Sequence, residues 1–248
     1  MSVISSLILQ RLAPAITAFV LFLNSVAGLF GAAPVIPYNP ERTDVVVSGE
    51  VTTDVNEILG YYNAAVKKTN KSFVIGSSSS KGNGTPEIVM DEETVSEITN
   101  ELMKTYWTTL EATSSTVFKV PGEGNVIAAD VESAKMSVKD GKRYVIINIV
   151  DTKDSGDENA LDRVYGYSAG LAESLNSSGY MTVDEKNVNA VYTDNTVSCI
   201  IDDDSGKIIY GDWDSTGSVE ISDITVEIAD VKTEIAKMSF SLTTNIDV

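Results

Sequence analysis

The 248-residue chain contains no histidine and only one cysteine, Cys199. The lack of imidazole excludes Ser-His-Asp triads, Cys-His nucleophiles and HExxH zinc helices. A single thiol excludes an intrachain disulfide and a multi-thiolate zinc site, and its apolar neighbours Val197 and Ile201 predict a small buried side chain. The remaining chemistry belongs to carboxylates, tyrosine, lysine and serine, and to hard cations held by oxygen, such as calcium or magnesium.

The first 33 residues contain no acidic side chain and one basic side chain, Arg11. The stretch Leu12–Ala27 is apolar and ends in small residues, as in an export signal, and cleavage after Ala27 fits this pattern best. The alternative is retention of residues 12–33 as a membrane anchor, since a spanning helix needs roughly 20 apolar residues. Either way, we expect a secreted protein, or one on the extracellular cell surface that residues 12–33 tether to the membrane.

Basic residues are scarce throughout the chain, with 18 Lys and Arg against 36 Asp and Glu, for a net charge of −18. Such a charge disfavours nucleic acid, anionic lipid and anionic wall polymers as partners. We therefore expect the partner to be a small neutral or hydrophobic molecule or another envelope protein. The charge also favours a soluble monomer, with membrane contact only through an uncleaved N-terminal segment.

Proline is concentrated between the apolar segment and the rest of the chain, at Pro34, Pro37 and Pro40, and the β-type run Val45–Val47 follows. Residues 34–51 are therefore predicted to be a proline-rich linker with a short edge strand. Residues 52–248 are predicted to form a single domain.

The periodicity of this domain indicates an α+β fold. A capping box at Asp54 and Glu57 begins a predicted helix over 54–68, and Asp140-Gly141 closes a predicted hairpin. Gly76–Gly84 has the composition of a mobile loop. The other predicted elements are helices from Asp91 and over 158–175, and strands over 116–120, 134–138, 143–150, 187–192, 196–201, 207–212, 218–228 and 234–247. We expect an antiparallel, curved sheet with about three helices on one face, and a bulge between Ile221 and Ile224.

Two groups of carboxylates are candidate calcium ligands. Asp202 and Asp204 belong to the run before Ser205-Gly206, where the spacing departs from that of an EF-hand loop and fits a charged turn. Asp151, Asp154 and Asp157 lie between a predicted strand and a predicted helix, whose N-terminus also favours acidic residues. We expect no cofactor, unless these residues hold calcium.

No catalytic motif is present, so we expect a non-catalytic protein. A carboxylate pair for glycoside hydrolysis would have to converge in space, which one sequence does not reveal. The tryptophans Trp107 and Trp213 could stack on carbohydrate, although their helix and strand spacing favours core packing. Three N-glycosylation triplets begin at Asn70, Asn83 and Asn176.

Three segments of the chain resemble an uncharacterised group of exported proteins from Gram-positive, clostridium-like bacteria. They are EILGYYNAAVKKTNKS at 57–72, VPGEGNVIAADVESAKMSVKDGKRYVIINIVD at 120–151, and TVSCIIDDDSGKIIYGDW at 196–213. The resemblance implies a bacterial cell-surface setting and no known activity. The signal segment departs from the group, because it lacks a lysine-rich start.

The sequence therefore predicts a non-catalytic extracellular or cell-surface binding module. Its contact surface would be a groove or rim of the sheet, and its ligand a neutral or hydrophobic molecule or an envelope protein. Two alternatives stay open, namely a carboxylate-based, glycosidase-like hydrolase and a calcium-dependent surface or adhesion component.

Overall fold

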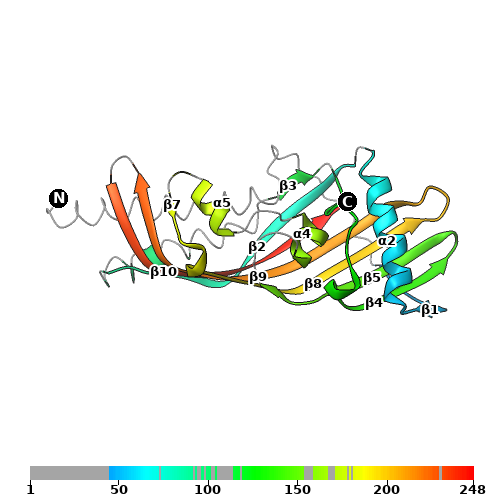
Figure 1. Cartoon of the computed structure of the whole chain (residues 1–248), viewed down its shortest axis with the longest axis horizontal. Helices are drawn as coiled ribbons and strands as arrows, with labels where there is room; N and C mark the ends of the chain where they lie inside the picture. The colour runs from blue at the N-terminus through cyan, green and yellow to red at the C-terminus, as the bar shows by residue number, and fades with distance from the viewer. Residues whose placement is uncertain are drawn as a thin grey trace.

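The fold is one open antiparallel sheet. A computed structural model describes residues 45–248 apart from 73, 92, 94–95, 98, 102–103, 105–113, 118, 154–158, 167–170, 178, 180 and 229–230. The main path has the order β1-β4-β5-β8-β9-β10-β2-β3, while β6 pairs with β8 and β7 with β9 (Figure 1). The strands are β1 (Val51–Thr52), β2 (Gly76–Val89), β3 (Ser114–Val117), β4 (Val131–Lys139), β5 (Lys142–Ile149), β6 (Thr152–Lys153), β7 (Met181–Thr182), β8 (Val188–Asp202), β9 (Lys207–Ile228) and β10 (Val231–Asp247).

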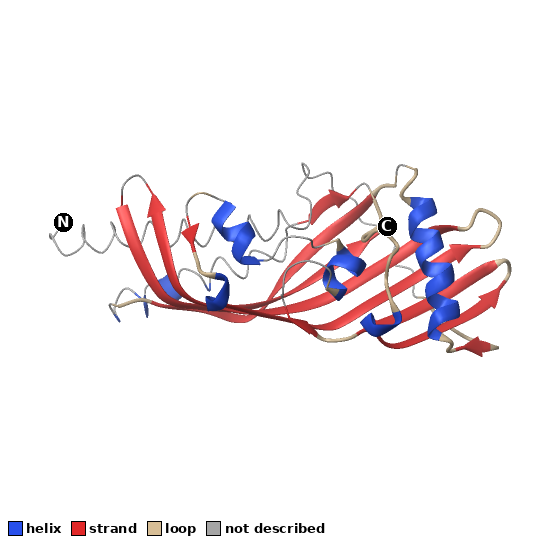
Figure 2. Cartoon of the chain, viewed as in Figure 1, coloured by secondary structure: helices blue, strands red, loops and turns tan. Residues whose placement is uncertain are grey.

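The helices α2 (Val55–Thr69), α4 (Ala160–Tyr165) and α5 (Leu171–Ser177) lie on one side of this sheet (Figure 2). Two short 3-10 turns, η2 (Ala128–Asp130) and η3 (Glu185–Asn187), precede β4 and β8. The predicted antiparallel sheet is confirmed. The predicted α+β balance is corrected, because strands dominate and the fold is mostly β.

Two segments account for this shift toward β structure. The predicted loop Gly76–Gly84 is part of β2, because its backbone pairs with β10 along its length and with β3 at its start. The predicted helix over 158–175 is divided, since α4 ends at Gly166, which has a left-handed φ of 77°. The helix predicted from Asp91 is helical at those of its residues that the structure describes between 93 and 104.

Helix α2 begins where its sequence predicts. Asp54 accepts hydrogen bonds from the backbone N–H groups of Asn56 and Glu57 at 3.0 and 3.1 Å. The predicted reciprocal bond from Glu57 is replaced by Thr52, whose hydroxyl donates to Glu57 and accepts from the backbone of Asp54. Lys67 and Lys68 lie in the last turn, as the helix dipole favours.

The predicted hairpin is formed by β4 and β5, with Asp140 and Gly141 at φ values of 52° and 69°. Farther along the chain, pairs of predicted strands merge into the long strands β8 and β9. The predicted change of phase in β9 is present, because Ile221 and Ile224 are both fully buried and Asp223 between them has a φ of 51°. The β9 to β10 register continues through this point, so the predicted bulge is not needed, and the hairpin turns upward there (Figure 1).

The short edge strand that was predicted near Val45–Val47 lies a few residues later in the chain. Val45–Val47 has no regular structure, and the edge strand is β1, which pairs with Met136 and Ser137 of β4. The predicted strand over 116–120 is also displaced, because β3 ends at Val117. The backbone N–H of Val120 instead donates to the side chain of Asn70, the residue that follows α2.

Two apolar clusters lie between the helices and the sheet. The α2 core lies under α2 and α4, and the α5 core lies under α5 at the other end. In the α2 core the indole N–H of Trp213 donates to the hydroxyl of Tyr62 at 3.0 Å. Gly211 makes room for this indole, since a Cβ at that position would lie 2.3 Å from a ring carbon. Trp213 and Cys199 are fully buried, as the sequence predicted.

Four asparagines fasten the helices to extended segments. Each side-chain amide donates to a backbone carbonyl and accepts from the N–H of the same residue, as a neighbouring strand would, and we call such a pair an asparagine clasp. The clasps join Asn63 to Val126, Asn70 to Val120, Asn100 to Ile88 and Asn176 to Val183, with lengths of 2.7 to 3.1 Å. Two of them hold the segment 119–127, which we call the strap, against α2.

Candidate functional site

The sheet presents a mainly polar surface on the side away from α2, α4 and α5, which we call the polar face. Side chains alternate along a strand, so the neighbours of Trp213 point away from the α2 core. The residues of the polar face, placed by strand register, are Tyr144, Ile146 and Asn148 of β5, Thr196, Ser198 and Ile200 of β8, Tyr210, Asp212, Asp214, Thr216 and Ser218 of β9, Ser241, Thr243, Asn245 and Asp247 of β10, and Ser79, Lys81 and Asn83 of β2.

Asp212, Asp214 and Asn245 form the centre of this face. The side-chain nitrogen of Asn245 donates to Asp212 Oδ1 at 2.5 Å and to Asp214 Oδ1 at 2.8 Å. Two carboxylates on alternate positions of one strand repel each other, and the amide between them offsets that repulsion. Asp212 is buried and Asp214 is partly exposed, so the pair lies at the surface with one member well screened from solvent.

Two further groups of hydrogen-bonded side chains lie on either side of this centre. On one side Asn148 donates to Ser133 at 2.7 Å, and the Thr196 hydroxyl contacts Asn148 at 3.4 Å. On the other side Asn83 donates to Thr243 at 2.8 Å, and the hydroxyls of Thr243 and Thr216 lie 3.2 Å apart. The donors and acceptors therefore sit in rows set by the spacing of the strands, roughly 4.8 Å.

Aromatic side chains lie beside the polar rows. Tyr144 of β5 and Tyr210 of β9 are the cross-strand neighbours of Ile200 in β8, and Ile200 is buried between them. Both tyrosines are partly exposed. The polar face thus combines a patch of ring surface with neighbouring hydroxyl and amide groups.

Helix α4 supports this face from the other side of the sheet. The hydroxyl of Tyr165 donates to the backbone carbonyl of Asp214 at 2.5 Å. Burial raises the pKa of Tyr165, and the nearby Tyr62 and Asp214 raise it further. The hydroxyl therefore stays protonated at neutral pH and remains a donor to the strand that carries the two aspartates.

The predicted calcium ligands Asp202 and Asp204 lie in the turn between β8 and β9. Asp202 accepts the backbone N–H of Ser205 at 2.7 Å, and the hydrogen bonds from Ser205 lower the pKa of that carboxyl group. Asp203 pairs with Arg143 at 2.7 Å, and Asp204 is exposed. These contacts are those of a charged turn.

The second group of predicted ligands is only partly described. Asp151 is exposed before β6, and Asp154 and Asp157 lie outside the described residues. β6 pairs with β8 at Tyr192, so Asp151 and Asp202 are separated by about ten residues of strand, or roughly 33 Å. Within the described part of the chain, no group of three or more Asp, Glu or Cys residues is arranged to hold a metal ion.

Sequence reasoning missed the polar face. The signal available was the alternation Tyr210-x-Asp212-x-Asp214-x-Thr216, which places these four side chains on one side of a strand. Asn245 lies 31 residues after Asp214, near the end of the next strand, so only the β9 to β10 register brings it between the aspartates. Trp213 is buried rather than available for stacking, and Trp107 lies outside the described residues.

Comparison with known proteins gives no match, whether to a protein-family model, to a curated protein or to a solved structure. Among the helices that the structure describes, none is both long enough and apolar enough to span a membrane.

Proposed function

We propose that the protein is a non-catalytic extracellular binding module that holds a neutral, hydroxyl-rich ligand, of the carbohydrate class, on its polar face. The observation that carries the proposal is that three groups of hydrogen-bonding side chains lie next to one another on this face: Ser133, Asn148 and Thr196 on one side, the centre at Asn245, and Thr216, Thr243 and Asn83 on the other side. A small number of polar groups next to aromatic side chains is typical of ligand-binding sites, in which the polar groups fix the orientation of the ligand.

The charge of the face supports a neutral ligand. Asp212 and Asp214 would repel an anion, whereas hydroxyl groups can donate to carboxylates and accept from amides and hydroxyls. Tyr144 and Tyr210 add flat apolar surface next to these groups. The export signal predicted from the sequence and the resemblance to exported bacterial proteins support a cell-surface setting, and the acidic net charge supports a monomer.

Affinity electrophoresis in gels that contain a neutral polysaccharide tests the proposal, using dextran, soluble starch, xylan and glucomannan. At least one polymer should retard the wild-type protein. The Thr216→Val/Thr243→Val double variant should lose at least ~80 % of the retardation, because both hydroxyls of one row are removed.

Thr225→Val is the matched control, since Thr225 lies on the same strand but at the far end, where it donates to Glu234 at 2.8 Å. The control should be retarded like the wild type. Equal retardation of both variants, or none by any of the four polymers, would exclude the polar face as a site for this ligand class.

A second candidate function is carboxylate-based glycoside hydrolysis, which one observation favours. Asp212 and Asp214 both accept from the same nitrogen, at 2.5 and 2.8 Å, so their two Oδ1 atoms lie no farther apart than the roughly 5–5.5 Å that separates the carboxyl groups of retaining glycosidases. Release of reducing ends from the polymer that binds best distinguishes the two functions. Hydrolysis that Asp212→Asn abolishes, and that Asp204→Asn in the exposed turn leaves intact, would establish an enzyme.

A further inference from the structure

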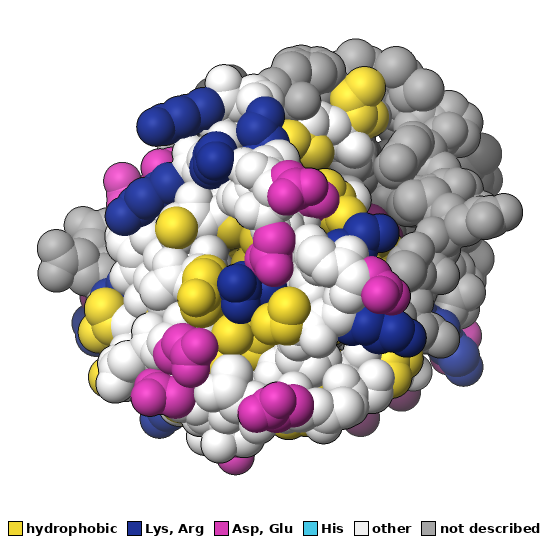
Figure 3. Space-filling model, turned by 90° about the vertical axis from the view of Figure 1, so that its right-hand side faces the viewer, with side chains coloured by type: hydrophobic (Ala, Val, Ile, Leu, Met, Phe, Trp, Pro, Cys, Tyr) yellow, Lys and Arg dark blue, Asp and Glu magenta, His cyan; other side chains and the backbone are white. Residues whose placement is uncertain are grey.

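Lysines from three separate segments gather around the C-terminal end of α2. Lys67 and Lys68 are in its last turn and Lys71 follows it, while Lys119 begins the strap and Lys207 begins β9. Figure 3 shows basic side chains grouped in its upper left part, where this end of α2 faces the viewer. We call these five residues the lysine cluster.

Hydrogen bonds made by side chains bring the segments of the cluster together. The Asn70 clasp places Val120, and with it the neighbouring Lys119, beside the end of the helix. Lys207 donates to the hydroxyl of Ser72 at 2.6 Å. A Cβ on Gly206 would lie 3.2 Å from Lys68 Nζ, so that side chain lies over the turn between β8 and β9.

The helix dipole explains only part of this arrangement. It favours cations in the last turn of α2, but Lys119 and Lys207 belong to other segments. Within the described residues, Lys67, Lys68, Lys71 and Lys119 have no carboxylate within ion-pair distance, in a chain with twice as many acidic as basic residues. By contrast, Lys186, Lys232 and Lys237 at the other end are each paired.

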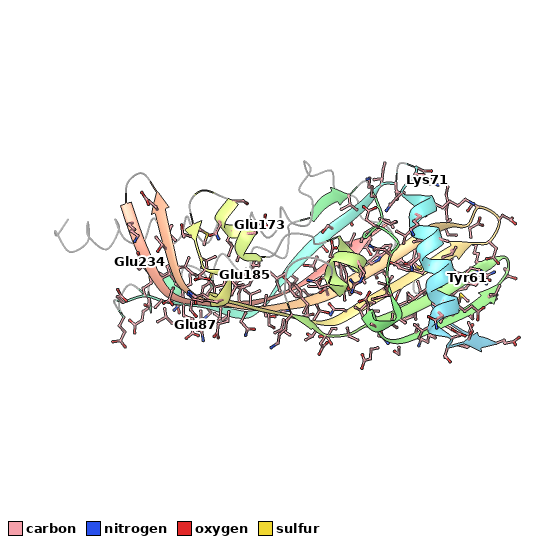
Figure 4. All side chains as sticks on the ribbon, in the orientation of Figure 1. Tyr61, Lys71, Glu87, Glu173, Glu185 and Glu234 are labelled. Carbon is pink, nitrogen blue, oxygen red and sulfur yellow. The ribbon has the colours of Figure 1, made fainter. Side chains whose placement is uncertain are left out.

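The two ends of the sheet therefore differ in charge. Figure 4 labels Lys71 at the α2 end and, toward the other end, Glu87, Glu173, Glu185 and Glu234. β9 alone has 22 residues and spans roughly 70 Å. Because the Debye length is about 8 Å in physiological salt, a surface in contact with the α2 end is screened from the acidic end.

The chain enters the described structure at the same end. Ser48 donates its backbone N–H to the hydroxyl of Ser137, close to the turn between β4 and β5. If residues 12–33 anchor the chain, the first part of the predicted linker, residues 34–44, would reach about 34 Å in a polyproline conformation. The α2 end would then be the part of the domain nearest the membrane.

We propose that the lysine cluster docks the domain on the anionic phosphate headgroups of a lipid membrane, with the acidic end directed away. The charge of the whole chain disfavours such a surface, but the attraction acts only through this end. Glu123 of the strap, Asp202 to Asp204 of the adjacent turn, and Glu50, Asp54 and Glu57 near the start of α2 limit its strength, although Arg143 neutralises Asp203.

Co-flotation of the full chain with vesicles tests the proposal. One set contains phosphatidylcholine alone and the other adds ~30 % phosphatidylglycerol, at 50 and 500 mM NaCl. An apolar anchor would bind both sets of vesicles alike. The partition coefficient for vesicles with phosphatidylglycerol, divided by that for vesicles without it, therefore measures the contribution of the lysine cluster. Because each lysine near an anionic surface raises partitioning roughly fivefold, the ratio should exceed ~10 at low salt and approach ~1 at high salt.

Lys67→Gln/Lys71→Gln/Lys119→Gln should abolish this ratio without changing the circular dichroism spectrum. The matched control, Lys186→Gln/Lys232→Gln/Lys237→Gln, removes three lysines at the other end of the sheet and should keep it. A wild-type ratio near ~1, or equal ratios for the two triple variants, would overturn the proposal. Tight binding of inorganic polyphosphate with no preference between the vesicles would assign the cluster to a soluble anion instead.

Discussion

The α2 core and the α5 core lie along the same three long strands, yet they are held in different ways. The α2 core is covered by a helix of 15 residues and contains the bond between Trp213 and Tyr62. Beside it, Arg163 of α4 forms a two-point ion pair with the buried Asp130, at 2.8 and 2.5 Å. The α5 core is mainly aliphatic, with three methionines and Phe240, and α5 has seven residues. Continuous strands therefore need not give uniform local stability, and we expect the α5 end to open first.

The largest expected effect comes from Trp213→Ala. Removing this fully buried side chain, together with its bond to Tyr62, should lower the free energy of unfolding by about 3–5 kcal/mol. Leu175→Ala in the α5 core should cost less, about 2–3 kcal/mol. Urea unfolding followed by far-ultraviolet circular dichroism measures both, and a larger loss for Leu175→Ala would reverse the comparison.

Breaking the ion pair of α4 should have the next largest effect. Arg163→Met leaves the Asp130 carboxylate buried without its cation and should cost about 3 kcal/mol. Adding Asp130→Asn removes that charge while keeping an oxygen for the N–H of Ile127, so the double variant should recover a good part of the loss. Additive losses in a double-mutant cycle would show that the pair is not coupled.

The asparagine clasps allow the same test at both ends. Asn63→Ala and Asn176→Ala each remove a donor and an acceptor from one extended residue, which should cost about 1–3 kcal/mol. Hydrogen exchange followed by mass spectrometry should show the loss of protection from Asn63→Ala in the strap, and that from Asn176→Ala confined to α5 and β7. Loss of protection throughout the chain for Asn176→Ala would mean that the two cores open together.

The smallest effect at neutral pH concerns Cys199. Burial raises the pKa of its thiol from 9.0 to about 12, and burial also raises the pKa of Tyr62. These groups stay protonated in the fold but ionise when it unfolds, so their stabilisation is complete below pH 9 and declines as the pH rises from there toward 12. Urea midpoints should fall above pH 9, and less steeply for Cys199→Ala. At pH 8 the native thiol should not react with a disulfide reagent.

The sequence was sufficient for elements whose signals are local. Asp54 and the apolar period that follows it predict α2, and Asp140-Gly141 predicts the hairpin. β2 could not be predicted in the same way, because its serines and glycines carry no strand signal and only pairing with β10 makes it a strand. The centre of the polar face depends on the same register, which joins Asn245 to Asp212 and Asp214. The expected calcium ligands were chosen because acidic residues lie close together in sequence there. A tight turn also favours aspartate, so this signal does not distinguish a metal site from a turn.

The clasp at Asn70 has a consequence for the sequence triplet that begins there. Its side-chain nitrogen donates to the carbonyls of both Val120 and Gly122, at 3.1 and 3.2 Å, so both of its hydrogens are engaged. An oligosaccharide attached to that nitrogen would replace one of them and displace the strap from the helix. A eukaryotic secretory host could therefore modify this asparagine only before the domain closes, and any sugar added in that interval would obstruct folding.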